Sequence, residues 1–157
     1  MSQSILLVDD EPILLKCVRR LLRPLEKKGV IVWTSTSAEE AVELLEKHSI
    51  DVVVTDENMV GMSGTELLAW ISENSPDTKR IVLTGDISVS IAMRAINHAG
   101  VDAYLTKPFN NAELLDAVLS ALHSKDRESR VQAIRESILK DLTDKAEEQI
   151  THESSTS

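Results

Sequence analysis

Short apolar runs alternate along this chain with longer stretches in which apolar residues recur every three or four positions. Five runs are predicted to be strands, at residues 5–8, 30–33, 51–55, 80–83 and 101–105. The stretches that follow them are predicted to be helices, at residues 11–28, 37–48, 64–74, 88–99 and 111–122. Such short apolar runs are typical of parallel strands buried on both faces. Because a helix follows each strand closely, the pattern predicts an α/β fold with a parallel sheet covered on both sides.

Several local signals mark the helix ends. Ser37 is the expected N-cap of its helix, with Glu40 completing a capping box. Pro24 is expected to bend or end the helix over 11–28, and Gly100 suits the position after the helix over 88–99. The single cysteine, Cys17, excludes an intramolecular disulfide and a cysteine-built zinc site. Its apolar surroundings predict a small buried side chain.

Composition narrows the class of protein. Of the 157 residues, 42% are hydrophobic and 27% are charged, as in ordinary globular domains. A run of about 18 apolar residues, as a membrane span needs, does not occur, and the N-terminus does not resemble a signal peptide. We therefore expect a cytoplasmic protein that does not enter membranes. The formal net charge is −9, without a concentrated basic patch, so direct binding to nucleic acid is not expected.

The composition changes after His123, which predicts three parts: a domain over 1–123, a charged amphipathic helical extension over 124–150 and a disordered tail over 151–157. In the extension, apolar residues recur in steps of three or four at Val131, Ile134, Ile138, Leu142, Ala146 and Ile150. Three interpretations of it stay open. It extends the preceding helix into a dimerising coiled coil, folds back on the domain, or is the stub of a longer protein.

Polar residues stand directly after four of the predicted strands. Asp9 and Asp10 follow the first strand, Asp56 the third, Thr84 the fourth and Lys107 the fifth. In open parallel sheets, sites form at the carboxyl ends of the strands. Acids, a hydroxyl and a lysine are therefore expected to converge at one edge of the sheet.

These residue types suit the transfer of a phosphoryl group. The Asp56 carboxylate can act as the nucleophile that forms an aspartyl phosphate. With Asp9 and Asp10 it offers oxygen ligands to a hard cation, and Mg²⁺ suits a site with few carboxylates. Lys107 brings a positive charge to the phosphate, and Thr84 brings a hydroxyl donor. Each residue alone is an ordinary turn residue, so the prediction rests on their joint occurrence.

Four segments carry a resemblance to a known family. They are residues 5–11 (ILLVDDE), 52–59 (VVVTDENM), 81–85 (IVLTG) and 103–109 (AYLTKPF). Together they resemble the response-regulator receiver domains of two-component signal transduction, over residues 4–123. The resemblance implies a flavodoxin-like (βα)5 fold, a doubly wound parallel sheet with strand order 2-1-3-4-5.

The resemblance also implies a role for each site residue. Asp56 would be the phosphoacceptor, assisted by Thr84 and Lys107, and Thr84 and Tyr104 would form the switch pair. The Mg²⁺ ligands would be Asp9, Asp10, Asp56 and the backbone carbonyl of Asn58. The bond between Lys107 and Pro108 is expected to be cis. One departure stands out, because Met59 is followed by Val60-Gly61 where receivers often have Met-Pro, and we expect a looser loop.

A receiver acts as a switch and not as an enzyme on a separate substrate. Its expected phosphoryl donor is a sensor histidine kinase or a histidine phosphotransfer protein. Phosphorylation would change the surface formed by residues 88–99, 101–105 and 111–122, and so control a partner protein or an output domain. A homodimer through this surface or through the C-terminal helix is a further expectation.

Three other functions compete with this interpretation. Phosphohydrolases of the haloacid-dehalogenase type place Asp-x-Asp after their first strand, whereas this chain has Asp-Asp-Glu and no room for a cap domain. A receiver-like module that is never phosphorylated is expected to lack some of the acids, Thr84 or Lys107. A flavodoxin needs Ser, Thr or Gly after the first strand, because acids there would repel the flavin phosphate.

Overall fold

The computed structural model of the chain describes residues 2–86, 88 and 100–155. It forms two compact units, Met1–Lys125 and Asp126–Ser157. The first unit contains a five-stranded sheet, and the second consists of the distal part of one long helix. The helix predicted over 88–99 falls almost entirely outside the described residues.

All five strands are parallel, and they lie in the order β2-β1-β3-β4-β5. Their bounds are β1 Ser4–Val8, β2 Ile31–Ser35, β3 Val52–Asp56, β4 Lys79–Thr84 and β5 Ala103–Thr106. The predicted fold class and strand order are both confirmed. β1 pairs with β2 on one side and with β3 on the other, so the chain reverses its winding direction beside β1. Such a switch point is where α/β sheets of this kind place their sites.

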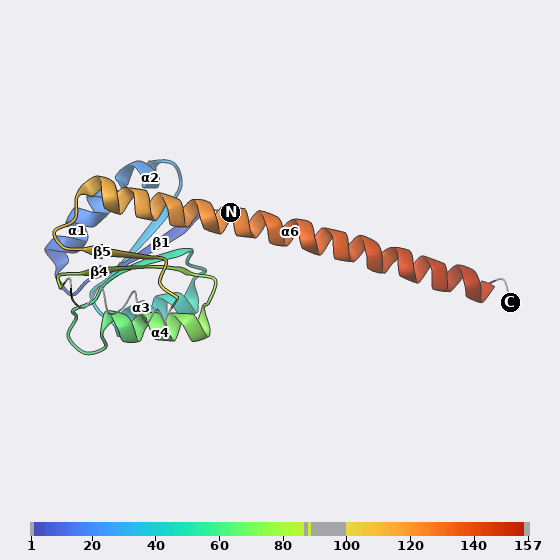
Figure 1. Ribbon diagram of the computed structural model, residues 1–157, viewed down its shortest axis with the longest axis horizontal. Coiled ribbons are helices and arrows are strands. Elements are labelled where there is room, and N and C mark those ends of the chain that lie inside the picture. The colour runs from blue at the N-terminus through green and yellow to red at the C-terminus, as the bar shows by residue number, and fades with distance from the viewer. Residues whose placement is uncertain (1, 87, 89–99, 156–157) are drawn as a thin grey trace. The chain divides into compact units, whose positions relative to one another are not determined.

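Helices cover both faces of the sheet (Figure 1). They are α1 Pro12–Leu21, α2 Arg23–Lys27, α3 Ala38–Lys47, α4 Gly64–Asn74 and α6 Asn111–Ser155. Alternate residues of β1 pack against the helices on opposite faces of the sheet. Ile5 and Leu7 pack in the cluster that includes residues of α1 and the first turns of α6. Leu6 and Val8 pack in the cluster that includes residues of α3 and α4. Because successive residues of β1 are buried on opposite faces, the strand is apolar from Ile5 to Val8 without alternation.

The helix predicted over 11–28 is interrupted at Leu22, two residues before Pro24, and Pro24 itself lies in the first turn of α2. Leu22 lies between α1 and α2 and is completely buried. The inward face of α1 is centred on Leu15, and Ile13 is 75% exposed. The prediction of a buried Cys17 is wrong, because this cysteine is exposed. Two positions separate Cys17 from Leu15, a rotation of about 200° around a helix of 3.6 residues per turn.

Side-chain caps fix the start of the two helices on the other face. The Glu40 N–H donates to Ser37 Oγ at 3.1 Å, which confirms Ser37 as the N-cap of α3. The Glu66 N–H donates to Ser63 Oγ at 3.1 Å in the same way at α4. These caps satisfy backbone donors that the first helical turn leaves unpaired. The Ser63 cap also fixes the end of the loop that leads from β3 into α4.

The last helix is longer than the sequence predicts. α6 runs without a break from Asn111 to Ser155, so the helices predicted over 111–122 and 124–150 are one element. Residues 151–155 are helical, which corrects the prediction of a disordered tail from residue 151. Among the helices that the structure describes, none has both the length and the apolar character needed to cross a bilayer.

Candidate functional site

The site residues are brought together because parallel strands end at the same edge of the sheet. β1 ends at Val8, directly before Asp9 and Asp10, and β3 ends at Asp56 itself. β4 ends at Thr84, and Lys107 follows the end of β5. The order β1-β3-β4-β5 places these strand ends side by side. The convergence predicted from the sequence is therefore observed.

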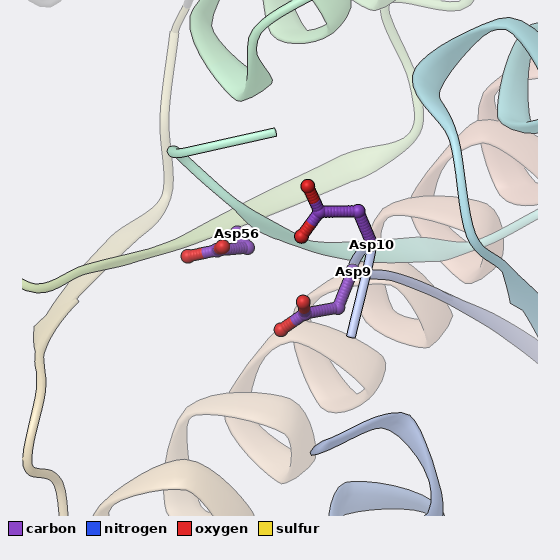
Figure 2. Close-up of side chains that lie close together, drawn as sticks. All are labelled: Asp9, Asp10 and Asp56. Atoms are coloured by element: carbon purple, nitrogen blue, oxygen red, sulfur yellow. The ribbon is translucent and has the colours of Figure 1, made fainter. Parts of the chain in front are cut away.

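Three carboxylates gather at this edge (Figure 2). Asp9, Asp10 and Asp56 each offer an oxygen, and these oxygens all lie within 4.8 Å of one another. Asp9 and Asp56 are buried, with 6% and 5% of their surface exposed, and Asp10 is half-buried. Like charges held this close repel one another unless a cation offsets them. Oxygen-only ligands at a partly open edge fit a hard divalent cation such as Mg²⁺.

Lys107 is the cation that contacts this cluster within the described part of the chain. Its Nζ donates to Asp56 Oδ1 at 3.0 Å and lies 3.9 Å from Asp9 Oδ2. The Lys107 backbone N–H donates to the carbonyl of Thr84 at 2.7 Å, which ties the lysine to the end of β4. The bond between Lys107 and Pro108 is cis, as expected. One lysine faces three acids, so the cluster keeps an excess of negative charge.

Burial raises the pKa of the Asp9 carboxyl above its ordinary value. The loss of hydration is the largest cause, because it disfavours the charged form. The Glu11 N–H donates to Asp9 Oδ1 at 2.9 Å and lowers the pKa, whereas the charge of Asp56 raises it. Lys107 lowers the pKa further and Asp10 raises it. The raised pKa means that the fold loses free energy by keeping Asp9 ionised at neutral pH.

Two carboxylates hold the loop between β3 and α4. The Val60 N–H donates to Asp10 Oδ2 at 3.1 Å, and the Met62 N–H donates to Glu39 Oε1 at 3.2 Å. Val60 stands where receivers often have proline, which has no N–H to donate. The sequence analysis missed both contacts, and no sequence signal distinguishes Glu39 from the other acids of α3. The valine at position 60 therefore gives the loop a hydrogen bond that a proline could not donate. From the sequence we expected only a looser loop.

The switch residues predicted by resemblance lie on neighbouring strands. Thr84 is completely buried, and its Oγ1 accepts from the Asp86 N–H at 3.2 Å. Tyr104 is half-buried on β5 and packs against the cluster on the α3 and α4 face. Asn58 is exposed in the loop two residues beyond Asp56. Thr84 thus ends the strand next to β3, and Tyr104 lies one strand further from the acidic cluster, on β5.

A profile of the response regulator receiver domain matches residues 5–119. Curated relatives include the hydrogenase transcriptional regulatory protein HoxA of Cupriavidus necator, 32% identical over 122 residues, which are 78% of this chain and 24% of HoxA. The transcriptional regulatory protein YvrH of Bacillus subtilis is 38% identical over 114 residues, 72% of this chain and 46% of YvrH. This chain thus matches between about a quarter and a half of the length of these relatives.

Solved structures agree with the profile. The signal receiver domain of an HD domain-containing protein from Pseudomonas fluorescens is 34% identical, with a TM-score of 0.73, covering 81% of this chain and 99% of that one. A CheY-like receiver domain protein from Methanospirillum hungatei is 30% identical, with a TM-score of 0.72, covering 82% and 99%. Both similarities span most of this chain and nearly all of the receiver domains.

Replacing Asp9 by asparagine is expected to stabilise the metal-free protein at pH 7. The folded state raises the pKa of Asp9, so the cost of ionising it is present at neutral pH and disappears below the unfolded pKa. We expect a higher Tm for Asp9→Asn in EDTA at pH 7, and a gain that shrinks toward pH 3. Asp77→Asn, which removes an exposed carboxylate, should change the Tm little. A lower Tm for Asp9→Asn would contradict this account.

Replacing Gly64 by alanine is expected to displace the backbone under Asp56. A Cβ at Gly64 would meet the carbonyl oxygen of Asp56 and lie 2.9 Å from the Cα of Glu57. Backbone atoms cannot move aside as a flexible side chain can, so we expect a loss of about 1–3 kcal/mol of unfolding free energy in urea titrations. The matched variant Gly85→Ala adds its Cβ in open space. Equal stability of the two variants would refute this packing argument.

Proposed function

Because the chain belongs to the response regulator receiver domain family, we propose that it is a phosphorylation-controlled switch with Asp56 as the phosphoacceptor. The observation that carries the proposal is the ion pair of 3.0 Å between Lys107 Nζ and Asp56 Oδ1 beside the carboxylates of Asp9 and Asp10. Asp56 ends β3, at the edge of the sheet where the site lies, and 5% of its surface is exposed. A metal-assisted phosphorylation site needs these groups together.

In the proposed reaction, a carboxylate oxygen of Asp56 attacks the phosphorus of a phosphohistidine. The O–P bond forms as the N–P bond breaks, and the imidazole nitrogen leaves with the electron pair. Lys107 already contacts Asp56 Oδ1 and can hold a phosphate oxygen by its charge. Asp9, Asp10, Asp56 and the Asn58 carbonyl would hold Mg²⁺, which supplies positive charge against the phosphoryl oxygens.

The proposed donor and output are those that membership of the family suggests. The proposed donor is a sensor histidine kinase or a histidine phosphotransfer protein, and the proposed location is the cytoplasm, where such donors act. Receivers pass the signal to a partner protein or an output domain. The relatives named as transcriptional regulators are longer than this chain, and the acidic charge of the chain disfavours direct contact with nucleic acid. The protein promotes only its own phosphorylation and dephosphorylation.

We place the switch at Thr84 and Tyr104. A phosphate on Asp56 would attract the Thr84 hydroxyl, whose Oγ1 accepts from the Asp86 N–H at 3.2 Å. Tyr104, half-buried on β5, would then pack further inward and shift the population of two arrangements. The affected surface would comprise β5, the first turns of α6 and the segment 88–99. Most of that segment lies outside the described residues.

Phosphorylation of Asp56 is measured by intact mass after incubation with acetyl phosphate and Mg²⁺. We expect one added phosphate of about 80 Da, labile to hydroxylamine and absent with EDTA. Asp56→Asn should gain no mass. An absence of the adduct with every donor would leave the unphosphorylated interaction module as the better interpretation. Steady turnover of free phosphate esters would instead favour the phosphohydrolase.

The switch is tested by hydrogen exchange in the peptide that covers β5. Phosphorylation should change exchange at residues 101–106 in the wild type. Thr84→Ala should still gain the phosphate, since it keeps all acids and Lys107, but its exchange at these residues should stay as in unphosphorylated protein. Asp56→Asn provides the unshifted reference. A full response in Thr84→Ala would exclude Thr84 as the coupling residue.

A further inference from the structure

The part of α6 beyond residue 125 exposes an apolar stripe that none of the described residues of its own unit covers. Six large side chains have between 50% and 68% of their surface exposed: Val131, Ile134, Ile138, Leu139, Leu142 and Ile150. Isolated helices are marginal in water, because most helical stability in proteins comes from packing an apolar face. A helix of this length with this stripe therefore indicates a packing partner.

The stripe is nearly symmetric about Lys140. Ile138 and Leu142 lie two residues to either side of Lys140, and Ile134 and Ala146 lie six residues to either side. At the ends of the stripe, Val131 and Ile150 deviate from this symmetry by one residue, which is about 1.5 Å along a helix. Two copies that run in opposite directions and cross at Lys140 would therefore place apolar side chains against apolar side chains.

Charge decides the direction of pairing. Residues 126–140 contain four basic and three acidic side chains, whereas residues 141–155 contain one basic and five acidic side chains. An antiparallel pair brings each acidic half against the slightly basic half of the other copy. A parallel pair would bring the two acidic halves together, which is unfavourable. Residues 1–125 carry 12 basic and 18 acidic side chains, so their net charge does not attract the acidic half either.

We propose that residues 126–155 form an antiparallel homodimer with the same residues of a second copy. The apolar residues on the two sides of Lys140 form the contact. The opposite net charges of residues 126–140 and 141–155 favour the antiparallel orientation. The steps between the apolar residues are mostly of four, longer than the 3.5 of a heptad repeat, so the two helices do not wind as a left-handed heptad coil. Pairing does not require a phosphate on Asp56.

The dimer is tested by sedimentation equilibrium of the full chain. Ile138→Lys and Ser137→Lys add the same charge one residue apart, but only the former removes a side chain of the stripe. We expect a wild-type dimer, a dissociation constant at least about tenfold higher for Ile138→Lys, and no weakening for Ser137→Lys. Monomeric wild type at tens of micromolar, or equal dissociation constants for the two variants, would overturn the proposal.

The direction is tested by disulfide formation in a Cys17→Ser background. Ile134→Cys and Ala146→Cys are oxidised separately and as a mixture. The antiparallel dimer predicts a cross-linked dimer in the mixture and little in either variant alone. Cross-linking of each variant alone, without a gain in the mixture, would establish a parallel pair and overturn the proposed direction.

Salt gives an independent readout that needs no variant. Attraction between the basic half of one copy and the acidic half of the other is screened as ionic strength rises. The dissociation constant of the antiparallel dimer should therefore be higher at 0.5 M than at 0.05 M NaCl, by about threefold or more. A parallel pair brings acidic halves together and should tighten over the same range. Tightening with salt would therefore contradict the charge argument.

Discussion

The contact of Lys107 with Asp56 depends on the order of the strands β3, β4 and β5 in the sheet. Asp56 ends β3, Lys107 follows β5, and β4 lies between the two strands. The Lys107 Nζ can reach Asp56 Oδ1 at 3.0 Å because parallel strands end at one edge and because the Lys107 N–H is tied to Thr84. This one cation offsets part of the repulsion among three carboxylates. The remaining negative charge is what makes the edge suitable for a divalent cation.

The same cluster lowers the stability of the fold. Burial raises the pKa of Asp9, so the chain keeps a costly ionised group at the end of an otherwise apolar strand. Asp10 contributes differently, since its carboxylate also holds the loop after β3 through the Val60 N–H. A change at Asp10, as on binding a cation, is therefore connected through one hydrogen bond to the loop that carries Asn58. Functional sites commonly lower the stability of a fold, as the ionised Asp9 does here.

The two units of the chain carry different features. The first unit contains the acidic cluster with Asp56 and Lys107, and its architecture is that of the receiver family. The described residues of the second unit contain no such acidic cluster, but they present an apolar stripe with unlike charges toward its two ends. If the second unit pairs as proposed, each dimer would carry two copies of the proposed phosphorylation site.

The sequence by itself determined the order of the described strands and helices, because apolar runs such as 5–8 and 52–54 suit strands that are buried on both faces and alternate with amphipathic stretches. It also determined which strand ends carry Asp9, Asp10, Asp56, Thr84 and Lys107. It did not determine that Cys17 and Ile13 lie outside, since α1 is apolar around much of its circumference and only packing selects Leu15. The contacts of Asp10 and Glu39 with the loop after β3 were likewise decided by the tertiary structure. They join residues far apart in the chain through backbone N–H groups, which every residue except proline possesses and which therefore leave no mark in the sequence.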